Sequence, residues 1–324
     1  MLNGDVVTQF IMSLAIMVLA FVFDFAVGDP PSRWHPVVWM GYVINKAKRL
    51  NRGSSAIRRV VGCLIALGVI CLFSVPVYFA LKFLSDLNLI VCVIASSALL
   101  KFTFAFRSLA DYTRPIANCL MKGDVNGARS YLPYIVRREP SKLDEKLMIS
   151  AAVESIAEST VDGVTSPLFY YSLFGVSGAM AFRVANTLDS MLGYKTQELK
   201  DFGWFSARLD TALNFVTARL TALLIAFSAW ILGLNARGSL KIAFRDHSKT
   251  ESLNAGWPMS AMAGALNVKL VKQGFYELGD SIEELKPNHI VKAIKVMRLT
   301  TLLHVAIICL PLIFLRCLFL SWVV

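Results

Sequence analysis

Residues 154–219 read ESIAESTVDGVTSPLFYYSLFGVSGAMAFRVANTLDSMLGYKTQELKDFGWFSARLDTALNFVTAR. In this stretch, segments apolar enough to enter a bilayer alternate with carboxylates, arginines and amides. These polar residues are Glu154, Glu158, Asp162, Arg183, Asn186, Asp189, Asp201, Arg208, Asp210, Asn214 and Arg219. A charge inside hydrocarbon is costly, so charged residues in membrane helices usually serve a function. The stretch therefore indicates a membrane protein with a polar site.

The composition of the whole chain agrees with this interpretation. Of its 324 residues, 56% are hydrophobic and 17% are charged, and the mean hydropathy is +0.58. Soluble domains average roughly 25% charged residues. Uncharged runs that can cross a hydrocarbon core of about 30 Å occupy residues 6–23, 60–81, 163–182, 220–236 and 299–315, with a shorter one at 87–100. We expect an all-α, polytopic integral membrane protein with five to six membrane helices.

Several runs have features that refine this expectation. The first run, residues 6–23, lacks the basic start and the cleavage site of a signal peptide, so we expect it to remain as a helix. The run at 163–182 contains Pro167, Gly175 and Gly178, which predict a broken span or a re-entrant pair of half-helices. Residues 107–148 and 235–298 are polar and are expected to form largely extramembrane, amphipathic cytoplasmic helices within one domain, 1–324.

The net charge of +11 could suggest nucleic-acid binding, but in a membrane protein it usually marks cytoplasmic loops. Residues 45–59 hold six basic and no acidic side chains, which places them in the cytoplasm and the N-terminus outside. With six crossings, residues 183–210 would then lie outside, on the opposite side of the membrane from residues 235–298. If residues 163–182 are instead re-entrant, residues 183–210 lie in the cytoplasm. A further re-entrant segment must then bring residues 235–298 back to the cytoplasmic side. We expect a multi-pass protein of the cell membrane, a cytoplasmic site and no nucleic-acid partner.

A polar motif, DFAVGDPPSRWHPVVWMG, follows the first run at residues 24–41. Its glycine and prolines prevent a continuous helix and predict a tight loop. These residues are Gly28, Pro30, Pro31 and Pro36. One interpretation is an interfacial turn in which Trp34 and Trp39 anchor the chain at the membrane surface. The other is the polar rim of an active site, formed with Asp24, Asp29, Arg33 and His35.

Glu154, Glu158 and Asp162 are spaced four residues apart. On one helix they share a stripe about 80° wide, where like charges repel each other. Carboxylates at a membrane edge can hold Mg²⁺ together with substrate phosphates. The alternative is a solvated acidic face, which the small, apolar residues between the carboxylates disfavour. The spacing predicts a magnesium site.

Arginines supply the opposite charge. Arg183, Asn186 and Asp189 are spaced so that they fall on one face of a helix. Arg208 and Arg219 are eleven residues apart, which is about 20° from eclipsed on one helix. Guanidinium groups match phosphate or carboxylate in bidentate geometry, so the pair predicts an anion clamp. Snorkelling to lipid headgroups is the alternative for Arg219. Farther along, His247 and His289 have no metal-ligand partner at useful spacing and are predicted to be surface residues. Upstream, Asp124 is predicted to N-cap a helix.

Five unusual strings resemble the CobD/CbiB family, the adenosylcobinamide-phosphate synthases of cobalamin biosynthesis. They occupy residues 24–41, 154–170, 182–194, 200–222 and 254–266, so the resemblance covers nearly the whole chain. The resemblance implies a membrane-bound ligase that uses ATP. Such an enzyme joins a carboxylate of adenosylcobyric acid to (R)-1-amino-2-propanol or its O-phosphate, giving adenosylcobinamide or its phosphate.

This chemistry suggests a role for each motif residue. A carboxylate needs activation before it can form an amide, and an acyl phosphate made from ATP is the simplest route. We assign Mg²⁺ to Glu154, Glu158 and Asp162, and phosphates to Arg183, Arg208 and Arg219. Asp189 or Asp201 is the expected base. The expected substrate-binding residues are Asp29, His35, Asn186, Asp210, Asn214, Asn254 and Trp257.

Two other functions fit the composition. A corrinoid transporter would also have a polytopic architecture with intramembrane charges. A non-catalytic scaffold would gather other enzymes of the corrinoid pathway, and we expect a ligase to associate with them as well. A transporter moves substrate across sealed vesicles without covalent change, and a scaffold consumes no nucleotide. A ligase forms a new amide as ATP is used.

Overall fold

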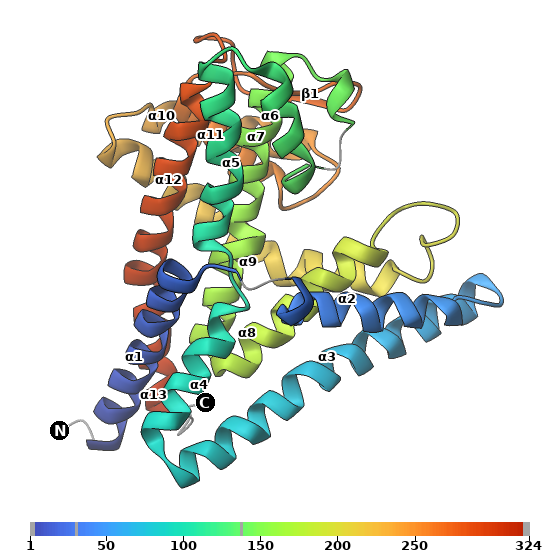
Figure 1. The fold of residues 1–324 in the computed structure, drawn as a ribbon, viewed down its shortest axis with the longest axis vertical. Helices are drawn as coiled ribbons and strands as arrows, with labels where there is room; N and C mark the ends of the chain where they lie inside the picture. The colour runs from blue at the N-terminus through green and yellow to red at the C-terminus, as the bar shows by residue number, and fades with distance from the viewer. Residues whose placement is uncertain (1–3, 30–31, 137–138, 320–324) are drawn as a thin grey trace. The chain divides into compact units, whose positions relative to one another are not determined.

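A computed structural model describes residues 4–29, 32–136 and 139–319, and these are helical almost throughout (Figure 1). The described residues contain six helical segments that are long and apolar enough to cross a membrane. They are Val6–Val27, Ser55–Leu87, Leu89–Met121, Glu145–Leu192, Trp204–Ile231 and Asn288–Phe319. The predicted all-α, polytopic membrane fold is confirmed. Pro30 and Pro31, expected to break the first helix, lie outside the described residues.

The chain divides into two compact units. The first unit comprises Met1–Ala105, Ser166–Leu213 and Ile307–Val324, and the second comprises Phe106–Thr165 and Asn214–Ala306. Helix α9, Trp204–Ile231, contributes to both units. A compact unit is a packing feature and not a sequence domain, so one domain over 1–324 stays a prediction.

The first unit is built from long apolar helices. Helix α8 packs against α2, α3, α4 and α13, and α1 packs against α4 and α13. The helices are α1 (Gly4–Val27), α2 (Pro36–Ala47), α3 (Ser55–Leu87), α4 (Leu89–Lys101), α8 (Ser166–Leu192) and α13 (Leu310–Phe319), with short 3₁₀ turns η1 (Ser32–Trp34) and η2 (Lys48–Leu50). The apolar runs at 60–81 and 87–100 lie in α3 and α4, which are joined at the single residue Asn88, whose side chain caps α4.

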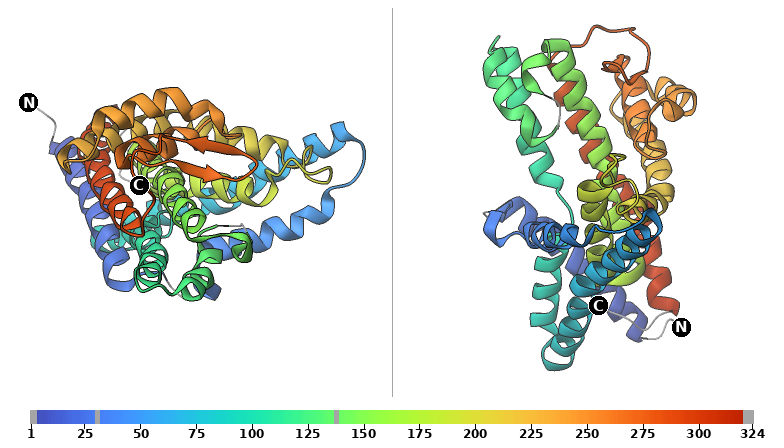
Figure 2. Two further views of the ribbon diagram at one scale, coloured as in Figure 1. Left: turned by 90° about the horizontal axis from the view of Figure 1, so that it is seen from above. Right: turned by 90° about the vertical axis from the view of Figure 1, so that its right-hand side faces the viewer.

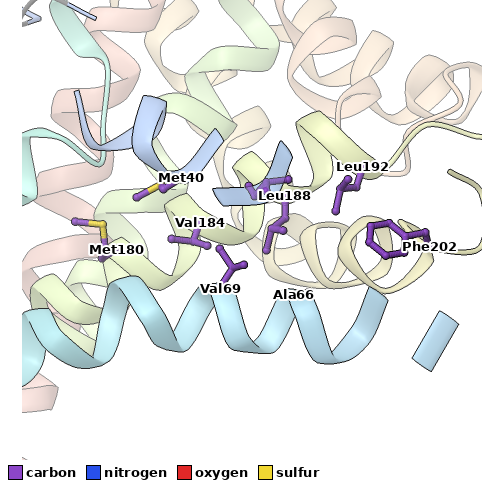
Figure 3. Packing of buried hydrophobic residues seen from close by; sticks show 9 residues of the cluster. Met40, Ala66, Val69, Met180, Val184, Leu188, Leu192 and Phe202 are labelled. Atoms are coloured by element: carbon purple, nitrogen blue, oxygen red, sulfur yellow. The ribbon is translucent and has the colours of Figure 1, made fainter. Parts of the chain in front are cut away.

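The core of the first unit lies between α2, α3, α8 and the loop before α9 (Figure 3). Its nine buried residues are Met40, Ile44, Ala66, Val69, Met180, Val184, Leu188, Leu192 and Phe202. Close backbone contact is possible here because Gly62 has no side chain. A Cβ atom at Gly62 would lie 1.9 Å from the carbonyl oxygen of Phe202.

The apolar run at 163–182 is broken as predicted, but not at every residue expected. A π-helical turn, η5 (Val161–Thr165), precedes Pro167, which has no N–H to donate to the preceding turn. Within α8, Gly175 has a φ of 70°, a conformation that glycine adopts easily, and the helix kinks there. Gly178 lies in helical backbone, so the break predicted there is wrong. Whether this segment is re-entrant stays a prediction.

The apolar run at 220–236 extends beyond the end of the helix that contains it. Helix α9 ends at Ile231, and Gly233 with a φ of 67° turns the chain. Asn235 then caps the next helix by accepting a hydrogen bond from the Gly238 N–H at 2.7 Å. A polar cap thus ends the predicted run before Ala236.

The second unit packs α7 against α5, α11, α12 and β1. Its elements are α5 (Phe106–Met121), α6 (Val125–Tyr131), η3 (Leu132–Tyr134), η4 (Pro140–Lys142), α7 (Glu145–Thr160), η5, α10 (Ala236–Asp246), η6 (His247–Lys249), α11 (Gly256–Leu266), β1 (Leu270–Lys272), β2 (Tyr276–Leu278) and α12 (Asn288–His304). A π-helical turn, η7 (Val305–Cys309), follows α12 at the unit boundary. The predicted cap is confirmed, since Asp124 accepts from the Gly127 N–H at 2.8 Å.

An antiparallel hairpin, β1 and β2, lies in the segment predicted to be helical (Figure 2). Its strands are three residues each, too short for an alternating pattern to be recognised in the sequence. The strands pair from Leu270 with Leu278 to Lys272 with Tyr276. The hairpin brings the Tyr276 side chain to α7, where it contacts a predicted site residue.

The small residues of 254–266 let helix α11 pack closely against its neighbours. Helix α11 is almost entirely buried and packs closely on α10. At Gly264 a Cβ atom would lie 2.3 Å from the carbonyl oxygen of Gly238, and at Gly256 it would lie 2.0 Å from that of His247. The glycines allow this approach, and it fixes the start of α11 with Trp257 and the loop before it with Asn254.

Candidate functional site

A polar cluster in the first unit forms around the motif at residues 24–41. Lys101, the last residue of α4, is 4% exposed, and its Nζ lies 2.6 Å from Oδ1 of Asp29. The same carboxylate oxygen lies 4.0 Å from Nε2 of His35. The His35 ring also makes an edge contact with Phe102, with ring centroids 5.7 Å apart. Two predicted residues therefore meet at a buried lysine that the sequence had not singled out.

The tautomer of His35 follows from its hydrogen bond. Its Nδ1 accepts from the Val37 N–H at 3.2 Å and caps α2. A backbone N–H can only donate, so in the neutral ring the proton is on Nε2. Burial lowers the pKa of His35 from 6.5; Asp29 opposes this shift, whereas Arg183 and Lys101 add to it. At neutral pH His35 is an uncharged ring that can donate through Nε2.

This arrangement predicts a pH-dependent stability. Because the folded pKa is lowered, the unfolded chain binds more protons below about pH 6.5, and stability falls as pH decreases. In His35→Asn, the amide oxygen replaces Nδ1 as the capping acceptor, and the side chain does not titrate. We expect wild type to lose thermal stability relative to His35→Asn between about pH 6.5 and pH 5, in unfolding curves measured in detergent. Parallel pH profiles of the two proteins would contradict this account.

A second pair extends the polar cluster along α8 and α9. Asn186, 9% exposed, donates from Nδ2 to Oδ1 of Asp210 at 3.1 Å. Arg183 is one helical turn earlier on α8, on the face predicted from its spacing to Asn186. Asp189 is half-buried near the end of α8, and its carbonyl accepts from the N–H of Gly193, four residues later, at 2.7 Å. The structure thus confirms a polar face on α8 and pairs it with Asp210.

Asp201 is held by ion pairs that stabilise the fold. It is 3% exposed, and its two carboxylate oxygens lie 3.1 Å from Arg58 and 3.0 Å from Arg59. A hydrogen bond from the Ser55 hydroxyl, together with these two guanidiniums, holds the pKa of Asp201 below its usual range, although burial opposes the shift. A carboxylate with a lowered pKa is a weak base at neutral pH. Its contacts tie the 193–203 loop to the start of α3.

The three carboxylates predicted to share a metal ion are not gathered into one site. Glu154 is 3% exposed, and its oxygens accept from the hydroxyls of Ser150 at 2.7 Å and Tyr276 at 2.8 Å. Glu158 is exposed, and Asp162 lies in the π-helical turn after α7 ends, which changes the predicted spacing. In the described part of the chain, no three His, Cys, Asp or Glu side chains are arranged to hold a metal.

The remaining predicted residues lie on or near α9. Arg208 is exposed, whereas Asn214 is 1% exposed. In the second unit, Nη1 of Arg219 donates to the Phe215 carbonyl at 2.6 Å and lies 3.3 Å from Oδ1 of Asn254. The guanidinium carbon is 5.2 Å from the Trp257 ring centroid. Arg219, Asn254 and Trp257, far apart in sequence, therefore form one group.

The prediction of two surface histidines is wrong for His289, which is 3% exposed. Its Nδ1 accepts from the Lys286 N–H at 3.0 Å, so Nε2 carries the proton and lies 3.3 Å from Oε2 of Glu283. These contacts hold the start of α12. His247 is half-buried and stacks on Trp257 with ring centroids 4.0 Å apart.

Some residues of these clusters were not predicted, because their partners are distant in sequence. Lys101 had one signal, as the single charge that interrupts the apolar residues of 87–106. Arg58 and Arg59 resembled ordinary cytoplasmic charges, and Tyr276 had no signal. In each case the partner carboxylate is more than seventy residues away, as in the pair Lys101 and Asp29.

The fold and these clusters define a polytopic α-helical membrane protein with charged residues on broken helices. The model of the CobD/Cbib protein family matches residues 17–297, and the chain belongs to this family. It is 44% identical over 278 residues to "Cobalamin biosynthesis protein CobD" of Dehalococcoides mccartyi, covering 86% of this chain and 90% of the relative. No solved structure matches the chain.

A second relative comes from an archaeon. The chain is 38% identical over 290 residues to "Probable cobalamin biosynthesis protein CobD" of Methanothermobacter thermautotrophicus, covering 90% of this chain and 95% of the relative. The residues matched by the family model, 17–297, include parts of both compact units. The family relationship thus extends over both compact units.

Proposed function

We propose that this chain works in cobalamin biosynthesis at the cell membrane, as an ATP-dependent amide ligase. Its substrates are adenosylcobyric acid and (R)-1-amino-2-propanol or its O-phosphate, and the product is adenosylcobinamide or its phosphate. Membership of the CobD/Cbib family supports the pathway. The observation that carries the reaction class is the cluster of Asp29, His35 and Lys101 beside Arg183.

The reaction requires cations and a proton acceptor. ATP supplies a phosphoryl group that turns the carboxylate oxygen of the corrinoid into a leaving group. The ammonium first gives one proton to the acceptor and becomes an amine, which attacks the acyl carbon. A C–N bond then forms, the C–O bond to phosphate breaks, and the nitrogen loses a second proton as phosphate leaves. Preorganised donors in a water-poor site stabilise the charge that develops on the oxygens.

The first-unit cluster supplies these donors. Lys101 and Arg183 bind anionic oxygens, and Nε2–H of His35 donates to the carbonyl oxygen that gains charge. Asp29 holds the Lys101 ammonium in place. We assign the proton acceptor to Asp189, because the two arginines on Asp201 make that carboxylate a poor base. In the first unit, the Asn186–Asp210 pair lines the substrate region, and Arg208 attracts phosphate from solvent.

Magnesium would be held by Glu158 and Asp162. One or two carboxylates plus phosphates are a usual Mg²⁺ ligand set, so the hydrogen-bonded Glu154 is not needed. We expect Glu158→Gln and Asp162→Asn each to raise the Mg²⁺ concentration for half-maximal turnover on the order of tenfold. Glu145→Gln, an exposed carboxylate at the start of the same helix, is the control. An unchanged Mg²⁺ requirement in both variants would rule out Glu158 and Asp162 as magnesium ligands.

The proposed reaction is tested by mass spectrometry. Detergent-purified protein is incubated with adenosylcobyric acid, aminopropanol phosphate, ATP and magnesium. We expect a product with the mass of the amide that is absent when ATP is omitted. Folded protein that binds the corrinoid but forms no amide would instead favour transport, tested in sealed vesicles, or a scaffold for other corrinoid enzymes.

A further inference from the structure

Arg219 is a cation on an apolar membrane helix without an acidic partner. It is half-buried on α9, and in the described part of the chain it forms no ion pair with a carboxylate. Its printed hydrogen bonds both use Nη1, which contacts Phe215 and Asn254. Nε and Nη2 remain available to a ligand. Ionisable residues in membrane helices normally pair or face a polar pathway.

Aromatic rings hold this guanidinium in position. Its central carbon lies 3.5 Å from the ring centroid of Phe215 and 5.2 Å from that of Trp257. Cation–π contacts stabilise a cation without neutralising it. The guanidinium therefore keeps its positive charge, which an anion can still neutralise.

Trp257 provides an independent sign of a missing acceptor. Its Nε1–H is buried and has no hydrogen-bond acceptor among the described residues. Burying a donor without a partner destabilises the fold, so such groups usually have a role. Arg219 and Trp257 are 38 positions apart in the sequence, yet their side chains contact each other. Each has at least one N–H donor without an acceptor.

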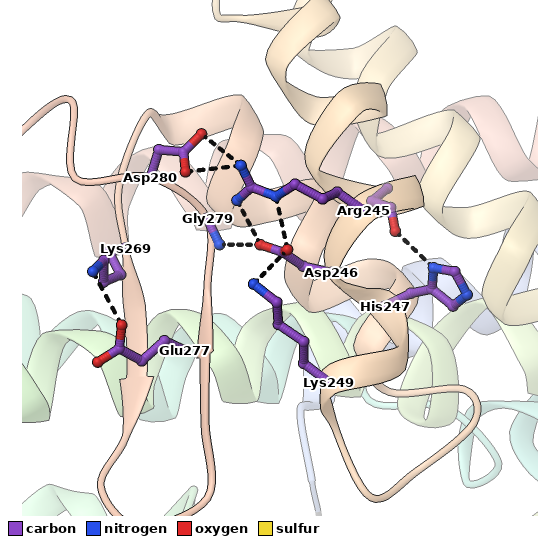
Figure 4. A network of polar contacts seen from close by, with 9 residues as sticks. Arg245, Asp246, His247, Lys249, Lys269, Glu277, Gly279 and Asp280 are labelled. Atoms are coloured by element: carbon purple, nitrogen blue, oxygen red, sulfur yellow. Dashed lines mark hydrogen bonds and ion pairs between the residues drawn. The ribbon is translucent and has the colours of Figure 1, made fainter.

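The neighbouring residues hold the Trp257 ring still. His247 stacks on it at 4.0 Å, and Phe244 meets its edge at 5.4 Å. Figure 4 shows that Nδ1 of His247 binds the Ala243 carbonyl and that the adjacent Asp246 is held by Arg245, Lys249 and the Gly279 N–H. Asp246 is fully buried. This network ties the end of α10 to the β-hairpin and preorganises the aromatic wall.

We propose that Arg219 and Trp257 form a phosphate-binding subsite within the second unit. The guanidinium binds two phosphate oxygens through Nε and Nη2, and the indole N–H binds one of them. Planar guanidinium matches phosphate in bidentate geometry, and α11 begins one residue before Trp257 with its positive dipole end. The subsite needs no residue of the first unit.

The choice of ligand rests on the proposed ligase, which uses a phosphorylated amine. An anionic lipid headgroup presents the same phosphate chemistry at a membrane helix. The two sources differ in solubility, so a water-soluble phosphate ester and a lipid can be tested separately. In either case, the proposed subsite predicts that binding of the phosphate depends on Arg219.

The test measures binding to the full chain in phosphatidylcholine nanodiscs. Aminopropanol O-phosphate is titrated calorimetrically without ATP or corrinoid, with unphosphorylated aminopropanol as the ligand control. We expect Arg219→Gln to weaken binding at least about tenfold and Arg219→Lys to lose less, because lysine keeps the charge but not the fork. Trp257→Phe, which removes only the indole donor, should weaken binding about fivefold. Arg237→Gln, an exposed arginine of α10, is the matched control.

A second arm uses native mass spectrometry of nanodiscs that contain phosphatidylglycerol. Retention of that lipid by wild type but not by Arg219→Gln, without binding of the soluble ester, supports the subsite with a lipid as its ligand. Equal binding of both phosphates by wild type and Arg219→Gln overturns it. Arg219-dependent binding without amide formation would retain the subsite and reject the ligase, whereas amide formation with Arg219-independent affinity would do the reverse.

Discussion

Lys101→Met is expected to reduce amide formation on the order of 100-fold, as removal of one charge-stabilising donor does in other enzymes. Methionine is close to lysine in length and apolar, so it can occupy the end of α4, but it cannot bind an anion. The same change leaves Asp29 without the cation 2.6 Å away. Because Asp29 is 27% exposed, we expect a stability loss of about 2 kcal/mol and not the larger cost of a fully buried charge.

The double variant Asp29→Asn/Lys101→Met separates catalysis from folding. It removes both charges together, so we expect thermal stability to recover while turnover remains low. Turnover by mass spectrometry and unfolding in detergent are measured on the same preparations. Lys82→Met, an exposed lysine of α3 in the same unit, is the control for lysine loss. Recovery of turnover in the double variant would show that the pair serves only the structure.

Gly62→Ala is expected to destabilise the first unit by about 3 kcal/mol or more, which is large for one methyl group. The new Cβ would lie 1.9 Å from the Phe202 carbonyl oxygen, and a backbone atom cannot rotate away as a side chain can. Relief requires the 193–203 loop to leave α3. That movement would also pull Asp201 from Arg58 and Arg59.

Gly68→Ala on the same helix is the matched control. Nothing lies within 4 Å of a Cβ atom at Gly68, so the extra methyl group has room. We expect its melting temperature to equal or slightly exceed that of wild type, because alanine favours helix over glycine. Thermal unfolding in detergent compares the two variants. Similar melting temperatures for both would contradict the close contact between α3 and the loop.

Local composition was sufficient to predict the helices. Residues 6–23, 60–81 and 299–315 are apolar over lengths that only a membrane helix accommodates, and each lies within a described helical segment. Gly175 also had a local signal, since glycine in a long apolar run often marks a break. The β-hairpin escaped prediction because strands of three residues have too few side chains to set a period.

The candidate site could be predicted in part. The spacing of Arg183 and Asn186 placed them on one face of α8, and the motif at 24–41 indicated Asp29 and His35. Periodicity along one helix could not reveal that α7 ends before Asp162, which lies in a π-helical turn. It also could not reveal that Tyr276 and Ser150 occupy the oxygens of Glu154.

The sequence by itself determined the membrane-helical class, the family and the residue types available for chemistry, because these depend on composition and on local strings. Only the tertiary structure decided which charges have partners. Lys101 meets Asp29, Arg58 and Arg59 meet Asp201, and Arg219 meets aromatic rings instead of a carboxylate. The reason is physical: the energy of a charge depends on the groups within a few ångströms, and packing brings those groups from distant parts of the chain.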